Sequence, residues 1–176
     1  MELTWEAMQV GRQPNSNLIF GLDELSHLMG RYVYVIETPR DLAIQYADGI
    51  SNVCYIGRQG ERSQGNRLLI HGKGWISRFL ILAQSDLPFT VHFCHPRRRN
   101  MVDAYKDIEA FLIREFEDVF GSPPLFNKRR ESELAGHEVT LNSNILRRRH
   151  KGTVCKIDAR GQIEPDALSL SSNKET

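Results

Sequence analysis

An arginine and a histidine one helical turn apart are residues whose types and spacing could do chemistry. Arg67 and His71 open a stretch with helical spacing, so both side chains project from the same side of the helix. The planar guanidinium of arginine can bind two oxygens of one phosphate group. Histidine changes its charge near neutral pH. Arg67 alone would fit a surface salt bridge. With His71 beside it, the pair suits a phosphate substrate, and His71 could position a water molecule or hydrogen-bond the phosphate.

Two glutamates interrupt the apolar side of a helix predicted over residues 100–121. Glu109 lies near Tyr105 and Leu112 at helical spacing, and Glu115 is also flanked by Leu112. Burying a carboxylate is costly unless a metal ion or a cationic side chain compensates for its charge. Each glutamate is therefore a candidate metal ligand, with a salt-bridged or partly solvated side chain as the alternative.

Three tyrosines lie in two short apolar runs, Tyr32-Val-Tyr-Val-Ile36 and Val53-Cys-Tyr-Ile-Gly57. Both runs are rich in β-branched and aromatic residues and are bounded by turn formers, which predicts strands. Residues i and i+2 of a strand share a face, so Tyr32 and Tyr34 could look into one site. Gly57 would let a phosphate or another backbone approach beside Tyr55. Each tyrosine taken alone would also fit an ordinary sheet aromatic.

The order of these residues resembles that of the GIY-YIG nuclease superfamily. The matching positions are its Gly-x-Tyr motif at Gly30-Arg31-Tyr32, its Tyr-x-Gly motif at Tyr55-Ile56-Gly57, and then Arg67, Glu109 and Asn127. The resemblance covers about residues 30–130. The Gly-x-Tyr spacing favours Tyr32 as the first tyrosine, whereas the Tyr-Val-Tyr-Val-Ile pattern of some relatives favours Tyr34. The family spacing before the asparagine favours Glu109 over Glu115.

The resemblance implies an α+β fold, a three-stranded antiparallel sheet flanked by helices, and a metal-dependent endonuclease acting on DNA, duplex in particular. The implied catalytic residues are Tyr32, Tyr34, Tyr55, Arg67, His71, Glu109 and Asn127. A strand tyrosine, with His71, would help deprotonate water, and Arg67 would stabilise the pentavalent phosphate. Glu109 would hold Mg²⁺ or Mn²⁺, and Tyr55 would orient the site.

Asn127 would orient the site with Tyr55, because its carboxamide could bind the glutamate or a phosphate; capping the next turn is the alternative. The family includes homing, repair, restriction and mobile-element nucleases, and the sequence does not select among them. A nucleic-acid-binding or partner-interaction module with this fold and no turnover is the second hypothesis.

Several further elements must position these residues. Strands are predicted over 32–37, 52–57 and 89–94, with weaker ones at 139–141 and 153–157, and helices over 21–30, 66–71, 75–84 and 100–121. Residues 38–51 read as a polar connection, longer than the family's usual link. The predicted organisation is an N-terminal extension (1–29), a nuclease-like domain (30–130), and a basic C-terminal extension (131–176) that ends in a disordered tail.

Composition indicates a globular protein of one domain, with 176 residues, 40% of them hydrophobic and 26% charged. The three cysteines include no Cys-x-x-Cys pair, which argues against a zinc ribbon or a disulfide scaffold and favours a reducing compartment. No signal peptide and no apolar run of the roughly 20 residues that span a bilayer are recognisable, so a cytoplasmic protein without membrane contact is predicted.

Basic clusters stand out against a net charge of only +1. They lie at Arg97-Arg98-Arg99, at Lys128-Arg129-Arg130, and at Arg147-Arg148-Arg149 with Lys151. Such clusters suit a phosphate backbone, and the second and third are predicted to bind nucleic acid; a solvated surface facing acidic residues is the alternative. Sequence specificity would have to come from loops, the basic C-terminal segment, a homo-oligomer or a partner chain.

Overall fold

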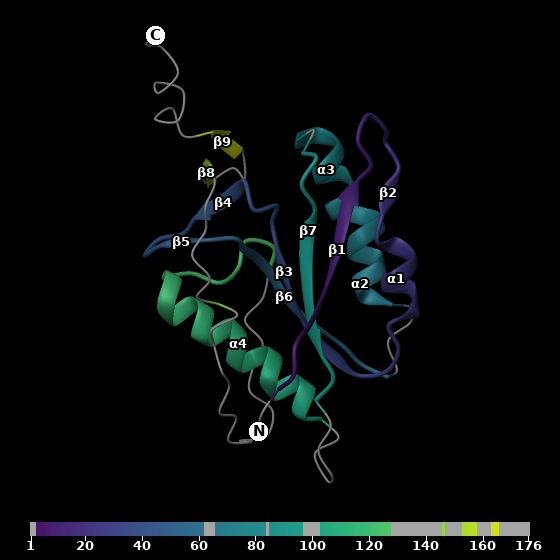
Figure 1. Cartoon of the computed structure of the whole chain (residues 1–176). Coiled ribbons are helices and arrows are strands. Elements are labelled where there is room, and N and C mark those ends of the chain that lie inside the picture. The colour runs from purple at the N-terminus through teal and green to yellow at the C-terminus, as the bar shows by residue number, and fades with distance from the viewer. Residues whose placement is uncertain are drawn as a thin grey trace.

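Five strands form the central sheet of the protein, in the order β2-β1-β7-β3-β6, and helices cover both of its faces (Figure 1). The computed structural model describes residues 3–61, 66–83, 85–96, 103–127, 146, 153–157 and 163–165. The sheet is antiparallel throughout, so the predicted α+β class and antiparallel sheet are confirmed. The predicted number of three strands was wrong.

The three predicted strands are β3 (Tyr32–Glu37), β6 (Val53–Gln59) and β7 (Phe89–Cys94). β3 lies between the other two, and every residue of it is buried, which explains its nearly continuous apolar run. The register places Tyr34 opposite Gly57 of β6 and opposite Phe93 of β7. Tyr34 therefore sits at the centre of the sheet.

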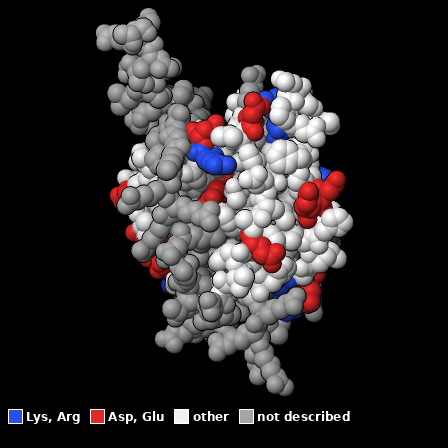
Figure 2. Space-filling view, viewed as in Figure 1, with Lys and Arg blue, Asp and Glu red and all other residues white. Residues whose placement is uncertain are grey.

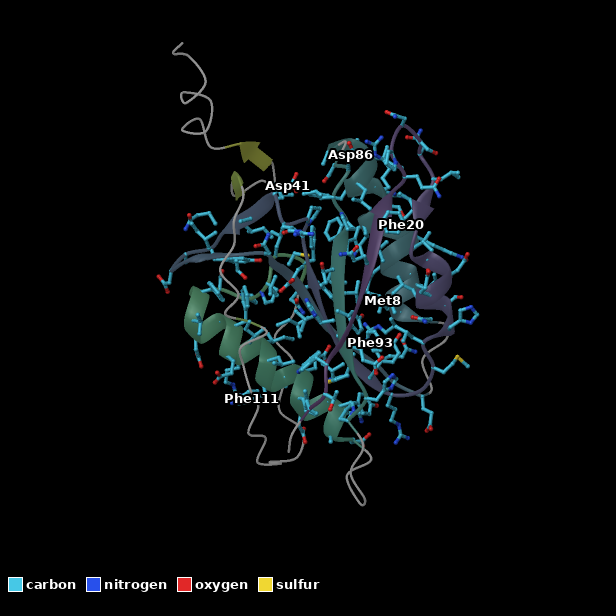
Figure 3. The ribbon with its side chains drawn as sticks, in the orientation of Figure 1. Met8, Phe20, Asp41, Asp86, Phe93 and Phe111 are labelled. Carbon is cyan, nitrogen blue, oxygen red and sulfur yellow. The ribbon has the colours of Figure 1, made fainter. Side chains whose placement is uncertain are left out.

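The two additional strands, β1 (Glu6–Arg12) and β2 (Ile19–Phe20), come from the segment that the sequence sets apart as an N-terminal extension. β1 pairs with β7, and β2 pairs with the far edge of β1. Figure 3 shows the side chains of Met8 and Phe93 on these neighbouring strands. β1 has only a weak alternation of polar and apolar residues. Its place in the sheet is set by its pairing with β7 and β2 rather than by its own composition.

A second, smaller sheet has the order β5-β4-β8-β9. Its strands are β4 (Leu42–Gln45), β5 (Ile50–Ser51), β8 (Thr153–Ile157) and β9 (Ile163–Pro165). The stretch 38–51, predicted as a polar connection, thus contains two short strands. The strand predicted over 153–157 is confirmed, and the one at 139–141 lies outside the described residues.

Three short helical segments follow one another after β6: α2 (Arg67–His71), the π-helical segment η1 (Gly72–Ile76) and α3 (Ser77–Ala83). The break predicted at 72–74 is confirmed, because η1 is kinked at Gly74, whose backbone angles leave the helical range. These segments and α1 (Leu22–His27) lie on one side of the sheet in Figure 1.

The long helix α4 (Ala104–Phe120) covers the other side of the sheet (Figure 1). It ends at Gly121, whose φ of 75° lies in the left-handed region that glycine adopts without strain. Its buried positions include Glu109, as the helical pattern predicted. In the described part of the chain, no helix is both long enough and apolar enough to cross a bilayer.

Candidate active site

Tyr34 is the centre of an aromatic cluster on the face of the sheet that α2 covers. Its ring stacks on Tyr55 with 5.9 Å between centroids and lies 6.2 Å from the ring of His71. The hydroxyl of Tyr34 is buried, and no residue in the described ranges forms a hydrogen bond with it. Such an unsatisfied buried donor is uncommon in proteins and points to a missing partner.

Electrostatics links Tyr34 to two charged residues of the predicted set. Burial is the main cause that raises the pKa of the Tyr34 phenol, and Tyr55 and the Glu109 carboxylate raise it further, whereas the Arg67 guanidinium lowers it. Arg67 and Glu109 are therefore both close enough to interact with the phenol. Because the net pKa is well above the ordinary value, Tyr34 is a neutral hydrogen-bond donor at neutral pH.

Gly57 makes room for the two stacked tyrosines. A Cβ atom at this position would lie 2.6 Å from Cε1 of Tyr55 and 2.7 Å from both Cζ and Oη of Tyr34. Those distances are far shorter than a van der Waals contact, so both rings lie over the glycine backbone. The motif glycine thus serves the packing of Tyr34 and Tyr55.

Tyr32 has a different environment, which separates it from Tyr34. Its hydroxyl donates a hydrogen bond of 2.9 Å to Oδ1 of Asn66. The same oxygen accepts the backbone N–H of Leu69 and so caps the N-terminus of α2. Tyr32 therefore holds α2 against the sheet, and of the two candidate tyrosines only Tyr34 keeps a hydroxyl that no described residue uses.

Arg67 occupies the first turn of α2 and is exposed. Its backbone N–H donates to Oε1 of Gln59 on β6 at 2.9 Å, which fixes the start of the helix over the sheet. Within the ranges that the structure describes, no hydrogen bond or ion pair joins its guanidinium to another residue. The backbone of Arg67 is thus fixed in place, and its guanidinium is available to bind a ligand.

His71 packs between Tyr55 and Trp75, with its ring centroid 4.7 Å from that of Tyr55. Its Nδ1 accepts a hydrogen bond of 3.1 Å from Nε1 of Trp75, whereas its buried Nε2 has no partner among the described residues. Burial, and then the charge of Arg67, lowers the pKa of His71 from 6.5 to about 4. The imidazole is therefore neutral at neutral pH.

Glu109 is buried and forms an ion pair with Arg58, with 2.6 Å between Oε2 and Nη1. Arg58 was not among the residues selected from the sequence. Part of the signal was present, because a buried carboxylate needs a cation. Arg58, however, lies just beyond the predicted strand 52–57, and only the structure extends β6 through it to Gln59. Glu115 is only partly buried. Among the residues that the structure describes, no group of three or more His, Cys, Asp or Glu side chains could hold a metal ion.

Asn127 binds the outer edge of β6 with its side chain. Its Oδ1 accepts the N–H of Ile56 at 2.9 Å, and its Nδ2 donates to the carbonyl of the same residue at 2.7 Å. The N–H of Phe126 also bonds the carbonyl of Cys54. The carboxamide thus replaces a neighbouring strand beside Tyr55. The following turn, which it would cap in the alternative interpretation, lies outside the described residues.

The predicted nucleic-acid-binding residues Lys128, Arg129, Arg130, Arg147, Arg148 and Arg149 lie outside the described residues. On the face in Figure 2, the Lys and Arg residues that the structure describes are isolated rather than gathered in a patch. The structure therefore brings Tyr34, Tyr55, Arg67 and His71 together and leaves the basic segments unplaced.

Neutral and cationic hydrogen-bond donors dominate this cluster. The exposed Arg67 guanidinium can donate to an acceptor-rich anion, whereas Tyr34 Oη and His71 Nε2–H are closed off from solvent and can donate to such a ligand only where the cluster opens. The arrangement is chemically suited to bind a phosphate group. Comparison with protein-family models, with curated proteins and with solved structures gave no match to this chain.

Proposed function

We propose that the protein is a metal-dependent nuclease that hydrolyses phosphodiester bonds, a DNA endonuclease with a site of the GIY-YIG type. The observation that carries this proposal is the pair of buried donors without described partners, Tyr34 Oη and His71 Nε2, with the exposed Arg67 close enough for its charge to act on both residues. Leaving buried donors unsatisfied costs free energy, so their retention favours a ligand that supplies acceptors. The non-bridging oxygens of a phosphodiester meet that need.

In this proposal Tyr34 and His71 bind and stabilise the phosphate. Both are neutral donors at neutral pH, since the pKa of Tyr34 is raised and that of His71 is lowered. This assignment replaces the expectation from the sequence that a strand tyrosine and His71 deprotonate water. Arg67 neutralises the charge that develops on the equatorial oxygens, because its guanidinium can bind two of them.

Tyr55, Asn127 and Asn66 act as positioning residues in the proposed site. Tyr55 stacks on Tyr34 and packs against His71, so it fixes the spacing of the two donors. Asn127 holds the strand edge next to Tyr55. Asn66 connects Tyr32 to the first turn of α2 and so aligns Arg67 with the sheet.

Glu109 is the residue we propose to hold the cation. A carboxylate is the ligand type that Mg²⁺ prefers, and one carboxylate with water molecules suffices for that ion, so the donor chemistry fits. Arg58 already contacts Oε2 of Glu109, so a bound ion shares the carboxylate with this arginine or displaces it. When bound, the ion would activate water and neutralise charge on the α4 side of β6, across this edge strand from Tyr34 and His71.

A binding module without turnover is the second candidate, and the Arg58–Glu109 pair favours it. This ion pair compensates for the buried carboxylate without a metal ion. Such a module would bind DNA through the same donors but would not cut it. The two candidates therefore differ in turnover and in their dependence on the cation, and they share the phosphate site.

The test is incubation of the purified protein with plasmid, linear duplex and single-stranded DNA, in Mg²⁺, in Mn²⁺ or in EDTA. We expect cleavage of at least one DNA form with either cation and none in EDTA. Arg67→Ala should lower the cleavage rate by roughly 100-fold or more. Arg78→Ala removes an exposed arginine from α3 and is the matched control, which should stay near the wild-type rate. DNA binding without cleavage under all conditions would favour the binding module.

A further inference from the structure

The two ring nitrogens of His71 have different environments, because Trp75 forms a hydrogen bond with only one of them. The indole N–H of Trp75 can only donate a hydrogen bond. Since it lies 3.1 Å from Nδ1 of His71, that nitrogen must carry the lone pair. The proton of the neutral imidazole is then on Nε2, the buried nitrogen that has no partner among the described residues.

Trp75 is held firmly enough to impose this state. Its ring lies 4.3 Å from that of Phe126 and 5.8 Å from that of Phe89, so residues from β7 and from the segment after α4 both pack against it. It also directly follows the kink at Gly74 in η1. The indole therefore has one defined position relative to His71.

Gly72 allows that segment to lie close to α1. A Cβ atom there would be 2.8 Å from Cδ2 of Leu22 and 3.0 Å from Cδ1 of Leu25. Side chains from α1 thus fill the space beside the π-helical turn, and Leu25 is fully buried in the core. The packing of α1 against η1 therefore helps to determine where Trp75 lies.

We propose that Trp75 is a positioning residue that fixes His71 in the Nε2–H state, so that His71 donates a hydrogen bond to substrate and cannot act as a general base. The lone pair of the imidazole is used by Trp75, and the other, buried nitrogen already bears a proton. Burial of the ring, which lowers the pKa of His71 to about 4, keeps this neutral state over the physiological range. The donor role rests on the nuclease proposed above; the protonation state does not.

Nitrogen-15 NMR of the imidazole tests the protonation state without any assay of activity. At neutral pH the wild-type protein should show Nδ1 without a proton and Nε2 with one, and the buried Nε2 proton should exchange slowly with solvent. Trp75→Phe keeps an aromatic ring and removes the indole N–H, so the two neutral states should become mixed. Trp5→Phe makes the same substitution at a tryptophan that no described hydrogen bond or ring contact links to His71; it is the control and should keep the wild-type pattern. A wild-type spectrum with the proton on Nδ1 would overturn the inference.

Cleavage kinetics test the role of the donor. His71→Gln can supply an N–H without titrating, so it should keep cleavage within roughly tenfold of the wild type, whereas His71→Ala should lose roughly 100-fold. Trp75→Phe should lower kcat by roughly tenfold with a smaller change in KM. If His71→Gln were as inactive as His71→Ala, His71 would not act as a donor. If the wild type cleaved no DNA, the nuclease would fail while the NMR result still decided the pairing of Trp75 with His71.

Discussion

The guanidinium of Arg58 lies 2.6 Å from the carboxylate of Glu109, and this pair joins β6 to α4 across the face of the sheet opposite the tyrosines. Only 6% of the Glu109 side chain and 18% of the Arg58 side chain are exposed. Each charge is therefore largely withdrawn from water and depends on the other. Since the charge of Glu109 also raises the pKa of Tyr34, the pair connects the packing of α4 to the candidate site.

Glu109→Gln tests the proposed metal ligand against its neighbour on the same helix. The substitution removes the charge that would hold the cation, so cleavage should fall by roughly 100-fold or more. Glu115→Gln is the matched control and should stay within a few fold of the wild-type rate. Rates of DNA cleavage and DNA affinity would be measured for both variants. An inactive Glu115→Gln with an active Glu109→Gln would show that the wrong glutamate was assigned.

The same substitution should also lower stability, because it leaves Arg58 without its carboxylate. Removing one partner of a fully buried pair costs about 3–5 kcal/mol, and partial exposure of Arg58 reduces the expected loss to about 2–3 kcal/mol. Urea denaturation of Glu109→Gln, Arg58→Met and the double variant measures the coupling of the two residues. Strictly additive losses would mean that the two side chains do not interact.

Tyr34→Phe should mainly lower activity, whereas Tyr32→Phe should mainly lower stability. Tyr34→Phe removes a buried hydroxyl without a described partner, so stability should be unchanged or higher by up to about 1 kcal/mol, while cleavage falls by at least roughly tenfold. Tyr32→Phe removes the hydrogen bond to Asn66 and should cost about 1 kcal/mol of stability with a smaller loss of activity. Thermal denaturation and cleavage rates would be compared, and the reverse pattern would identify Tyr32 as the site tyrosine.

Gly57→Ala should disturb both stacked tyrosines. The added methyl group would lie 2.6 to 2.7 Å from atoms of Tyr55 and Tyr34, which should cost about 1–3 kcal/mol of stability and most of the activity. Denaturant unfolding and cleavage assays measure both effects. A stable and active Gly57→Ala would contradict the packing of the two rings over this strand.

His71 should make stability depend on pH. Its pKa is lowered from 6.5 to about 4 on folding, so the unfolded chain binds a proton that the folded chain does not bind in this interval. Its contribution to stability is therefore present above pH 6.5 and is lost as pH falls towards about 4. Other groups titrate over the same range, so the measurement is the difference in unfolding free energy between the wild type and His71→Gln as a function of pH. Parallel curves for the two proteins would exclude this contribution.

Local patterns in the sequence determined many elements of this protein. The apolar runs predicted β3, β6 and β7, and the helical spacing of apolar residues predicted α4 with Glu109 on its buried side. These predictions hold because a strand or helix that covers a core repeats its apolar positions at a fixed period. The weakly patterned β1 could not be found this way, since its pairing with β7 depends on residues far away in the chain.

Only the tertiary structure decided which candidate residues meet. Tyr32 and Tyr34 share a strand face, and the sequence left them equivalent; Asn66 on another element takes the hydroxyl of Tyr32 alone. The sequence indicated that Glu109 needs a cation, and the packing of α4 on β6 supplied Arg58. Such hydrogen bonds and ion pairs form between segments distant along the chain, so their partners are set by how the elements pack and not by the period of any one element.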